Sequence, residues 1–307
     1  MADLSVHDSH NAPTRRVWDE VSDTRHAPFG RHRLAPWREV LRSFGTKLYP
    51  RRYPRIGSII NWPIWRLSLL GRPGPVDLEP FPGFRLRLYP RENHADTKCF
   101  SRAALCDLPE ERAMARGAAS SPDDQFIVVD VGANTGTYSV LLANLARGIG
   151  KRANLTCIEA NPKTQVRLAE NLRFSGLEGC TAVVASAVSN TPGTVMLDTD
   201  QWNLGSVKVT DAPNSQTGKK LVSVPARTLL AIVDDVALPR IDFLKIDIEG
   251  HEIQALRSFL REAPAHMLPR MILAETKHDK DAELAALIIG AGYHVTHHGR
   301  SDTVFER

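Results

Sequence analysis

Two carboxylates and a histidine stand together near residue 250, where they could perform acid–base chemistry. Asp247 and Glu249 end a mainly apolar, β-branched segment that begins at Ile241, and His251 follows them. The segment predicts a buried strand, and alternation along a strand would place both carboxylates on the same side. Two like charges this close tend to raise one pKa, which suits a general base. Open α/β sheets bind their ligands at such strand ends.

Two other roles are open for these side chains. Together with His251, the carboxylates could hold a divalent ion, although the pattern D-x-E-x-H is not an established metal signature. Glu249 could instead cap the helix that we expect from Gly250 to Leu260. We expect no metal ion, because this strand supplies only two carboxylates in sequence.

A glycine-rich segment predicts the turn that would position a nucleotide-like cofactor. The apolar residues 126–129 lead into Asp130, the chain turns at Gly132, and a helix begins near Gly136. Glycine is needed where a cofactor approaches the backbone, because any Cβ would hold it off. The spacing D-x-G-x-x-x-G differs from the dinucleotide fingerprint G-x-G-x-x-G. It favours a ligand without a pyrophosphate, S-adenosylmethionine first, although such a turn can also merely connect a strand to a helix.

The next two predicted strands supply an acidic residue and a run of small residues. Glu159 ends the strand 154–159, where a carboxylate can accept hydrogen bonds from both ribose hydroxyls of an adenosine. The alternative for Glu159 is a solvated charge at a strand end. Ser186 and Ala187 follow the strand 182–185, and their small size leaves room for a flat adenine ring.

Strands and helices continue to alternate up to the C-terminus. We expect a fifth strand at 271–275, an amphipathic helix at 282–289, and a closing hairpin over 293–306. This order predicts an α/β fold with a doubly wound, mostly parallel sheet and helices on both faces. The antiparallel C-terminal strand is typical of methyltransferase sheets and not of dehydrogenase sheets.

Three of these segments together resemble the FkbM-type methyltransferases: VDVGANTG at 129–136, IEANP at 158–162 and FLKIDIEGHE at 243–252. The predicted strand at 84–89 and the segments 203–206 and 224–229 are also similar to that family. The resemblance covers about residues 84–307, and its specific part is the K-I-D-x-E-G-x-E pattern. It implies a class I methyltransferase that uses S-adenosylmethionine, generally on hydroxyl groups of sugars or secondary metabolites.

We therefore predict an O-methyltransferase in which Asp247 removes the proton of the acceptor hydroxyl, supported by Glu249 and His251. An NAD-dependent oxidoreductase of similar fold remains an alternative, although the chain has no Tyr-x-x-x-Lys pair. A further alternative is a non-catalytic protein that contacts RNA through a basic arm. The residues expected to contact the cofactor are Asp130, Gly132, Asn134, Gly136, Thr137, Glu159, Ala160, Ser186, Ala187 and Asp247.

The first 75 residues differ from the remainder in charge and proline content. They hold 13 Lys and Arg against 6 Asp and Glu, and eight prolines prevent long regular structure. We expect a disordered basic arm at 1–35, an N-terminal extension with short helices and strands at 36–120, and the catalytic domain at 121–307. The short helices expected within 36–70 would dock on the sheet. Trp62 and Trp65 would pack on the catalytic domain or, alternatively, touch an anionic membrane or a nucleic acid.

The overall composition agrees with a soluble enzyme of 307 residues, of which 42% are apolar. Four cysteines without a C-x-x-C pair predict a reducing, cytoplasmic location and no zinc site. The most apolar stretch, 56–70, is interrupted by polar residues, so we expect no transmembrane segment. As partners we expect a small-molecule or glycan acceptor and no stable nucleic acid.

Overall fold

The computed structural model describes residue 18 and residues 27–48, 54–102, 108–198, 209–210, 221–277, 282–299 and 301–307. Most of the predicted basic arm lies outside the described residues. The same holds for the segment 203–206, which contributed to the family resemblance.

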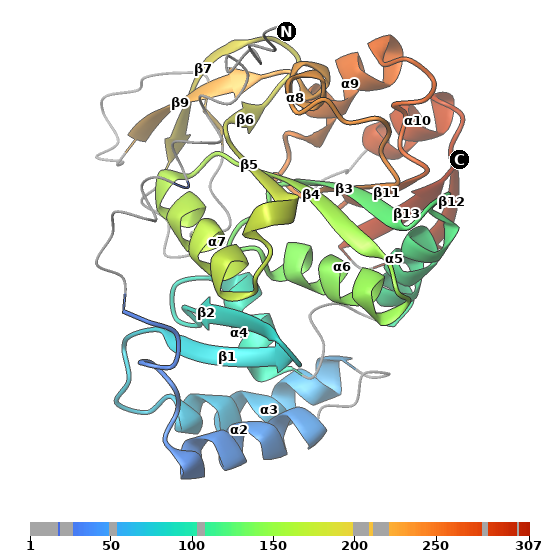
Figure 1. Ribbon diagram of the computed structural model, residues 1–307. Coiled ribbons are helices and arrows are strands. Elements are labelled where there is room, and N and C mark those ends of the chain that lie inside the picture. The colour runs from blue at the N-terminus through green and yellow to red at the C-terminus, as the bar shows by residue number, and fades with distance from the viewer. Residues whose placement is uncertain are drawn as a thin grey trace, which may run out of the picture.

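A seven-stranded sheet forms the centre of the protein, in the order β12-β13-β11-β10-β3-β4-β5 (Figure 1). Its parallel strands are β3 (Gln125–Val131), β4 (Arg152–Glu159), β5 (Thr181–Ala185), β10 (Phe243–Ile246) and β11 (Met271–Glu275). β13 (Asp302–Glu306) runs antiparallel to β11 and forms the closing hairpin with β12 (His294–His298). The predicted doubly wound sheet with an antiparallel C-terminal strand is confirmed.

Helices cover both faces of this sheet because its strands are apolar on both sides. In β3, Phe126 and Val128 belong to one core, while Ile127 and Val129 belong to the other. The first core is covered by α5 (Leu108–Ser120), α6 (Thr137–Gly148) and α7 (Pro162–Phe174). The second is covered by α8 (Leu229–Asp235), α9 (Glu252–Glu262) and α10 (Glu283–Gly290). Figure 1 shows the two helical layers on either side of the strands.

A smaller sheet follows the edge strand β5. It has the order β6-β9-β7-β8, and the short 3₁₀ helix η1 (Glu178–Cys180) precedes β5. Its strands are β6 (Ala187–Val188), β7 (Gly193–Asp198), β8 (Val209–Thr210) and β9 (Leu221–Arg227).

An N-terminal layer packs against α6 and α7, below the sheet in Figure 1. It consists of α2 (Pro36–Leu48), α3 (Pro54–Ser68), the antiparallel pair β1 (Val76–Phe81) and β2 (Phe84–Leu88), and α4 (His94–Ser101). α2 and α3 contact each other and α4 instead of docking on the central sheet as predicted. No helix among the described residues is long and apolar enough to cross a membrane.

Two predicted boundaries of the N-terminal region differ from the structure. Residues 27–35 are not a disordered arm, because Gly30 N and His32 N donate hydrogen bonds to Asp77 Oδ2 at 2.7 and 3.0 Å. At the other boundary, α5 packs on the central sheet: a Cβ added at Gly117 would lie 3.1 Å from Phe243 and 3.5 Å from Met271. We therefore propose that the catalytic α/β unit begins at α5 and not at residue 121.

Candidate active site

A cavity that opens to solvent lies at the carboxyl ends of β3, β4 and β10, where open α/β sheets bind ligands. Ala95 of α4 and Leu197 of β7 complete its walls. Ten residues expected in the site line this cavity: Gly132, Asn134, Thr137, Glu159, Ala160, Ser186, Ala187, Asp247, Glu249 and His251. Asp130 and Gly136 are not among its lining residues.

Gly132 is required by the protein's own backbone, which is a different reason from the predicted close approach of a cofactor. Its φ is 76°, and a Cβ there would lie 2.0 Å from the carbonyl oxygen of Asp247. Any side chain at this position would therefore push apart the ends of β3 and β10. Gly132 holds the turn and the candidate base in contact.

The backbone N–H groups of this turn are already used within the protein. Gly132 N and Ala133 N donate to Ile158 O at 2.9 and 3.1 Å, and Gly136 N donates to Ala133 O at 2.9 Å. Asn134 N donates to Glu159 Oε2 at 2.9 Å. A pyrophosphate site needs such N–H groups to point at the ligand. The geometry of these four therefore disfavours a dinucleotide.

Glu159 connects the glycine turn to the segment after β4. Its Oε2 accepts from Asn134 N, and its Oε1 accepts from Asn161 N at 2.8 Å. Each carboxylate oxygen has two lone pairs, so both can still accept a hydrogen bond from a ligand hydroxyl. Burial raises the pKa of Glu159 to about 7, although the two N–H donors favour the ionised form.

Asp130 lies beneath the cavity instead of lining it, because its carboxylate is occupied by neighbouring side chains. Ser139 Oγ donates to Asp130 Oδ2 at 2.7 Å, and Lys245 Nζ lies 3.4 Å from Asp130 Oδ1. The same Nζ lies 3.7 Å from Asp247 Oδ2. Although burial disfavours a charged lysine, these two carboxylates hold the pKa of Lys245 above its ordinary value. Lys245 is a cavity residue that the sequence did not single out.

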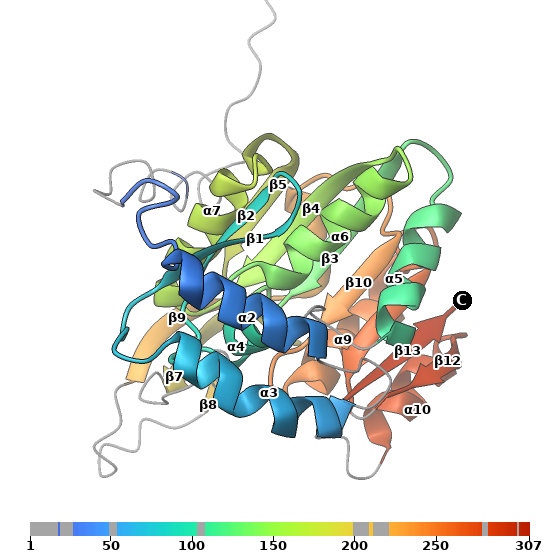
Figure 2. The same ribbon diagram turned by 90° about the horizontal axis from the view of Figure 1, so that it is seen from below.

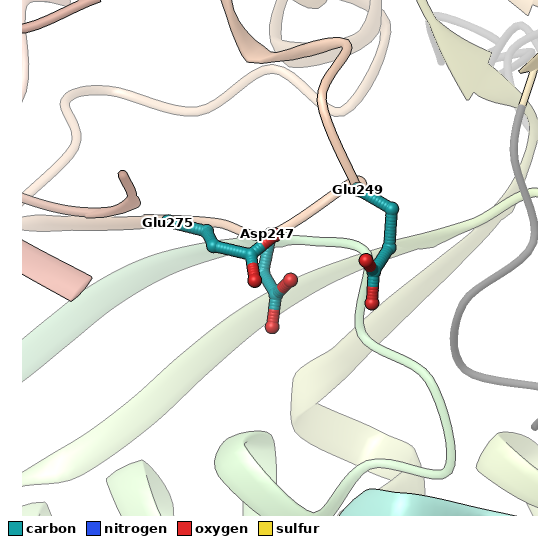
Figure 3. Close-up of side chains that lie close together, drawn as sticks. All are labelled: Asp247, Glu249 and Glu275. Carbon is teal, nitrogen blue, oxygen red and sulfur yellow. The ribbon is translucent and has the colours of Figure 1, made fainter. Parts of the chain in front are cut away.

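Asp247, Glu249 and Glu275 form an acidic cluster at the ends of β10 and β11 (Figure 3). One carboxylate oxygen from each lies within 4.8 Å of the others. The predicted cause of this proximity is wrong for Glu249: β10 ends at Ile246, so strand alternation does not reach it. Glu249 instead has a φ of 56°, and this turn brings its side chain back beside Asp247.

Glu275 was missed because no local motif marks it. One feature could have indicated it: Glu275 is the last residue of β11. The carboxyl end of β11 lies at the same sheet edge as that of β10. Burial and the charges of Asp247 and Glu249 raise the pKa of Glu275 to about 8. The predicted effect of like charges on a pKa is therefore seen at this third carboxyl group.

Glu252, and not Glu249, accepts the hydrogen bonds at the start of α9. Glu252 Oε1 accepts from Ile248 N at 2.9 Å and from Gly250 N at 3.2 Å. This is the bond pattern that was considered for Glu249, whose side chain lines the cavity. His251 Nε2 lies 3.2 Å from Ser189 Oγ, at the cavity wall.

α4 supports the glycine turn from the N-terminal layer. Asn93 Nδ2 donates to Asn134 Oδ1 at 2.6 Å, and Thr135 Oγ1 donates to Asp96 Oδ1. Asp96 is fully buried, and burial raises its pKa to about 6. The turn is therefore braced by β4 on one side and by α4 on the other.

The sheet order, the reversed last strand and a cavity at the carboxyl ends of the strands are those of the class I, Rossmann-like methyltransferase fold. A family model, the Methyltransferase FkbM domain, matches residues 130–295, more than half of the chain. The chain belongs to the FkbM methyltransferase family.

Individual relatives are distant. The hexuronic acid methyltransferase AglP of Haloferax volcanii is 23% identical over 151 residues, which cover 49% of this chain and 57% of AglP. The crystal structure of an FkbM methyltransferase from Methylobacillus flagellatus is 16% identical, with a TM-score of 0.42, and covers 88% of this chain and 59% of that one. An O-methyltransferase from Bacillus cereus in complex with SAH is 10% identical, with a TM-score of 0.39, over 65% and 80% of the two chains. The chain thus spans less than two thirds of the first two relatives.

Proposed function

We propose that this protein transfers a methyl group from S-adenosylmethionine to a hydroxyl group of a sugar, either free or within a glycan. The observation that carries the proposal is a single cavity with Glu159 on one side and Asp247 two strands away. Hexuronic acid is the substrate in the printed name of the relative AglP, which supports a sugar acceptor.

The charges of the cavity fit the proposed cofactor. Glu159, Asp247 and Glu249 line it together with one ammonium group, that of Lys245. Such a surface favours a ligand that carries a sulfonium and an ammonium charge, and it repels the two negative charges of a pyrophosphate. Glu159 would accept hydrogen bonds from the ribose hydroxyls, and the small residues Ser186 and Ala187 would border the adenine.

The chemical step needs a base more than it needs a nucleophile on the enzyme. When bound, S-adenosylmethionine supplies an activated methyl group on a positively charged sulfur. Asp247 would orient the acceptor hydroxyl and accept its proton, with Glu249 and His251 beside it. Lys245, 3.7 Å from Asp247 Oδ2, would keep this carboxylate in place.

The first prediction concerns the ribose site. Glu159→Ala should weaken binding of S-adenosylmethionine and S-adenosylhomocysteine by about 1–3 kcal/mol, because two ligand hydroxyls lose their acceptor. Titration calorimetry measures this directly. Glu178→Ala, at a half-exposed glutamate of η1, is the matched control and should leave both affinities unchanged. Equal affinities for the Glu159→Ala variant and the wild type would remove Glu159 from the site.

The raised pKa of Glu159, about 7, adds a pH dependence to this prediction. The ionised carboxylate is the better acceptor, so affinity should be full above pH 7 and decline as the pH falls through that value. Below the pKa, Kd should rise by up to about tenfold per pH unit, until it levels off near the affinity of Glu159→Ala. Glu159→Gln should flatten this profile, since the amide does not titrate. A profile of the same shape in wild type and variant would assign the titration to another group.

The second prediction concerns a metal ion at the acidic cluster. Glu275 provides the third carboxylate that the sequence did not place there, so the number of ligands no longer argues against a metal. Lys277 Nζ, however, lies 3.3 Å from Glu275 and 3.7 Å from Glu249, and Lys245 lies near Asp247. Because these ammonium groups already offset the negative charge, we propose that catalysis is metal-free and that EDTA leaves turnover unchanged.

Two measurements decide this point. Release of S-adenosylhomocysteine is followed with a sugar acceptor before and after EDTA, and MgCl₂ is titrated into the EDTA-treated protein by calorimetry. Loss of turnover that Mg²⁺ restores, together with saturable Mg²⁺ binding, would make Asp247, Glu249 and Glu275 metal ligands.

A further inference from the structure

The outward side of α2 and α3 carries most of the exposed large apolar side chains. Nine of the twelve such side chains among the described residues lie between residues 37 and 70. We call these nine the α2–α3 apolar face: Trp37, Val40, Phe44, Leu48, Ile59, Ile60, Trp62, Leu67 and Leu70. The two helices lie side by side at the bottom of Figure 1 and in front in the view from below (Figure 2). An apolar patch of this extent on a folded protein marks an interaction site.

α2 is amphipathic, but its apolar stripe faces away from the protein. Trp37, Val40, Phe44 and Leu48 follow each other at helical spacing, and Val40 is 69% exposed. Arg42, in contrast, points inward: its side chain is only 12% exposed, and its Nη1 donates to Phe100 O at 3.2 Å. A helix that served only to cover a core would take the opposite orientation. Its apolar stripe therefore needs a partner outside the described structure.

α3 repeats part of this arrangement. The buried Asn61 donates a hydrogen bond to Ser101 O of α4, and the partly buried Trp65 packs against the main hydrophobic core. On the outer side, Ile59 is 75% exposed and Trp62 is 53% exposed. Both helices thus present apolar side chains outward, and each donates a hydrogen bond to α4, from Arg42 and from Asn61.

The same segment is strongly basic. Residues 36–72 contain eight Lys and Arg against one acidic residue, together with three of the five tryptophans. The Arg66 guanidinium lies 4.6 Å from the centre of the Trp62 ring, and that of Arg38 lies 4.6 Å from the Trp37 ring. Tryptophan beside arginine is typical of helices that lie at the boundary between lipid headgroups and acyl chains.

We propose that the α2–α3 apolar face binds the surface of an anionic lipid bilayer. The apolar side chains would enter the headgroup region, and the exposed Lys47 and Arg66 would contact the negatively charged headgroups. A second copy of this chain fits the face less well, because a twofold interface would bring two equally basic surfaces together. An RNA partner would leave Val40, Ile59 and Leu67 against phosphate and water.

Vesicle co-sedimentation of the full chain tests this proposal. The wild type should sediment with phosphatidylcholine vesicles that contain about one third phosphatidylglycerol, and binding should weaken as salt increases. Vesicles of phosphatidylcholine alone should bind it at least about tenfold more weakly. Phe44→Asp and Trp62→Asp should each lose most of the binding to the anionic vesicles.

The matched control is Ile289→Asp, which changes an equally exposed apolar side chain on α10, far from this face in sequence. It should bind anionic vesicles like the wild type. Thermal melting and S-adenosylmethionine binding by all three variants should match the wild type, so a loss of vesicle binding would not reflect misfolding or a failed methyltransferase site.

Two results would overturn the proposal. The first is a wild type that stays in solution with anionic vesicles, or variants Phe44→Asp and Trp62→Asp that bind them like the wild type. The second is a wild-type dimer in sedimentation velocity that these same variants convert to monomers without any vesicle binding. That result would assign the face to self-association.

Discussion

Asp247→Asn is expected to lower turnover by about 10²–10⁴-fold, which is the usual effect of removing a general base. The carboxylate follows the last residue of β10, lines the cavity and is 37% exposed, so an acceptor hydroxyl can reach it. Asparagine preserves the size of the side chain but cannot accept a proton. Affinity for S-adenosylmethionine should change little, because the base acts mainly in the transition state.

Steady-state release of S-adenosylhomocysteine with a sugar acceptor provides the measurement for this variant. Asp235→Asn, at an exposed aspartate that pairs with Arg227 at the end of α8, is the control and should keep full turnover. If Asp247→Asn also keeps full turnover, Asp247 is not the base. The next residues to test are then His251 and Glu275. Of these, Glu275 has a pKa raised to about 8.

Arg87→Met is expected to destabilise the fold by about 3–5 kcal/mol, because it leaves two carboxylates buried without their counter-charge. Arg87 Nε lies 2.8 Å from Asp77 Oδ1 and its Nη1 lies 2.6 Å from Glu170 Oε1, and all three side chains are almost fully buried. These contacts join the β1–β2 hairpin to α7, and Arg87 Nη2 also donates to Pro28 O at 3.1 Å. The change should therefore loosen the N-terminal layer from the catalytic unit.

Urea denaturation of wild type and variants measures this effect. Arg85→Met is the matched control on the same strand, because the Arg85 side chain is 50% exposed and its ion pair with Glu79 spans 4.0 Å. Exposed pairs contribute at most about 1 kcal/mol, so this variant should remain close to the wild type. A similar, small effect of both substitutions would show that the buried network does not hold the two parts together.

The parts of the fold and site that could be predicted from sequence are those with a local signal. The segment from Asp130 to Gly136 predicted the end of a strand, a turn and the start of a helix. The strand β11 was expected at its observed bounds. Glu159 and Asp247 were expected at the cavity, which both line, because each follows or ends an apolar strand that a parallel sheet brings to one edge. The order of strands and helices was sufficient for the fold class.

What the sequence could not show depends on contacts between distant segments. Glu275 reaches the acidic cluster only through the pairing of β11 with β10, and Gly132 is required because Asp247 O occupies the space of a Cβ. Asp130 was expected at the cofactor, but the approach of Lys245 across the sheet places it in a buried ion pair. The inverted amphipathicity of α2 likewise becomes visible only once its inner side is known.

Calorimetric titration with S-adenosylmethionine, S-adenosylhomocysteine, NAD and NADP in parallel tests the assignment of the cofactor most directly. The cavity charges and the occupied N–H groups of the glycine turn predict saturable binding of the first two ligands, at one site per chain, and none of either dinucleotide. Binding of NAD or NADP without binding of S-adenosylmethionine would contradict the account.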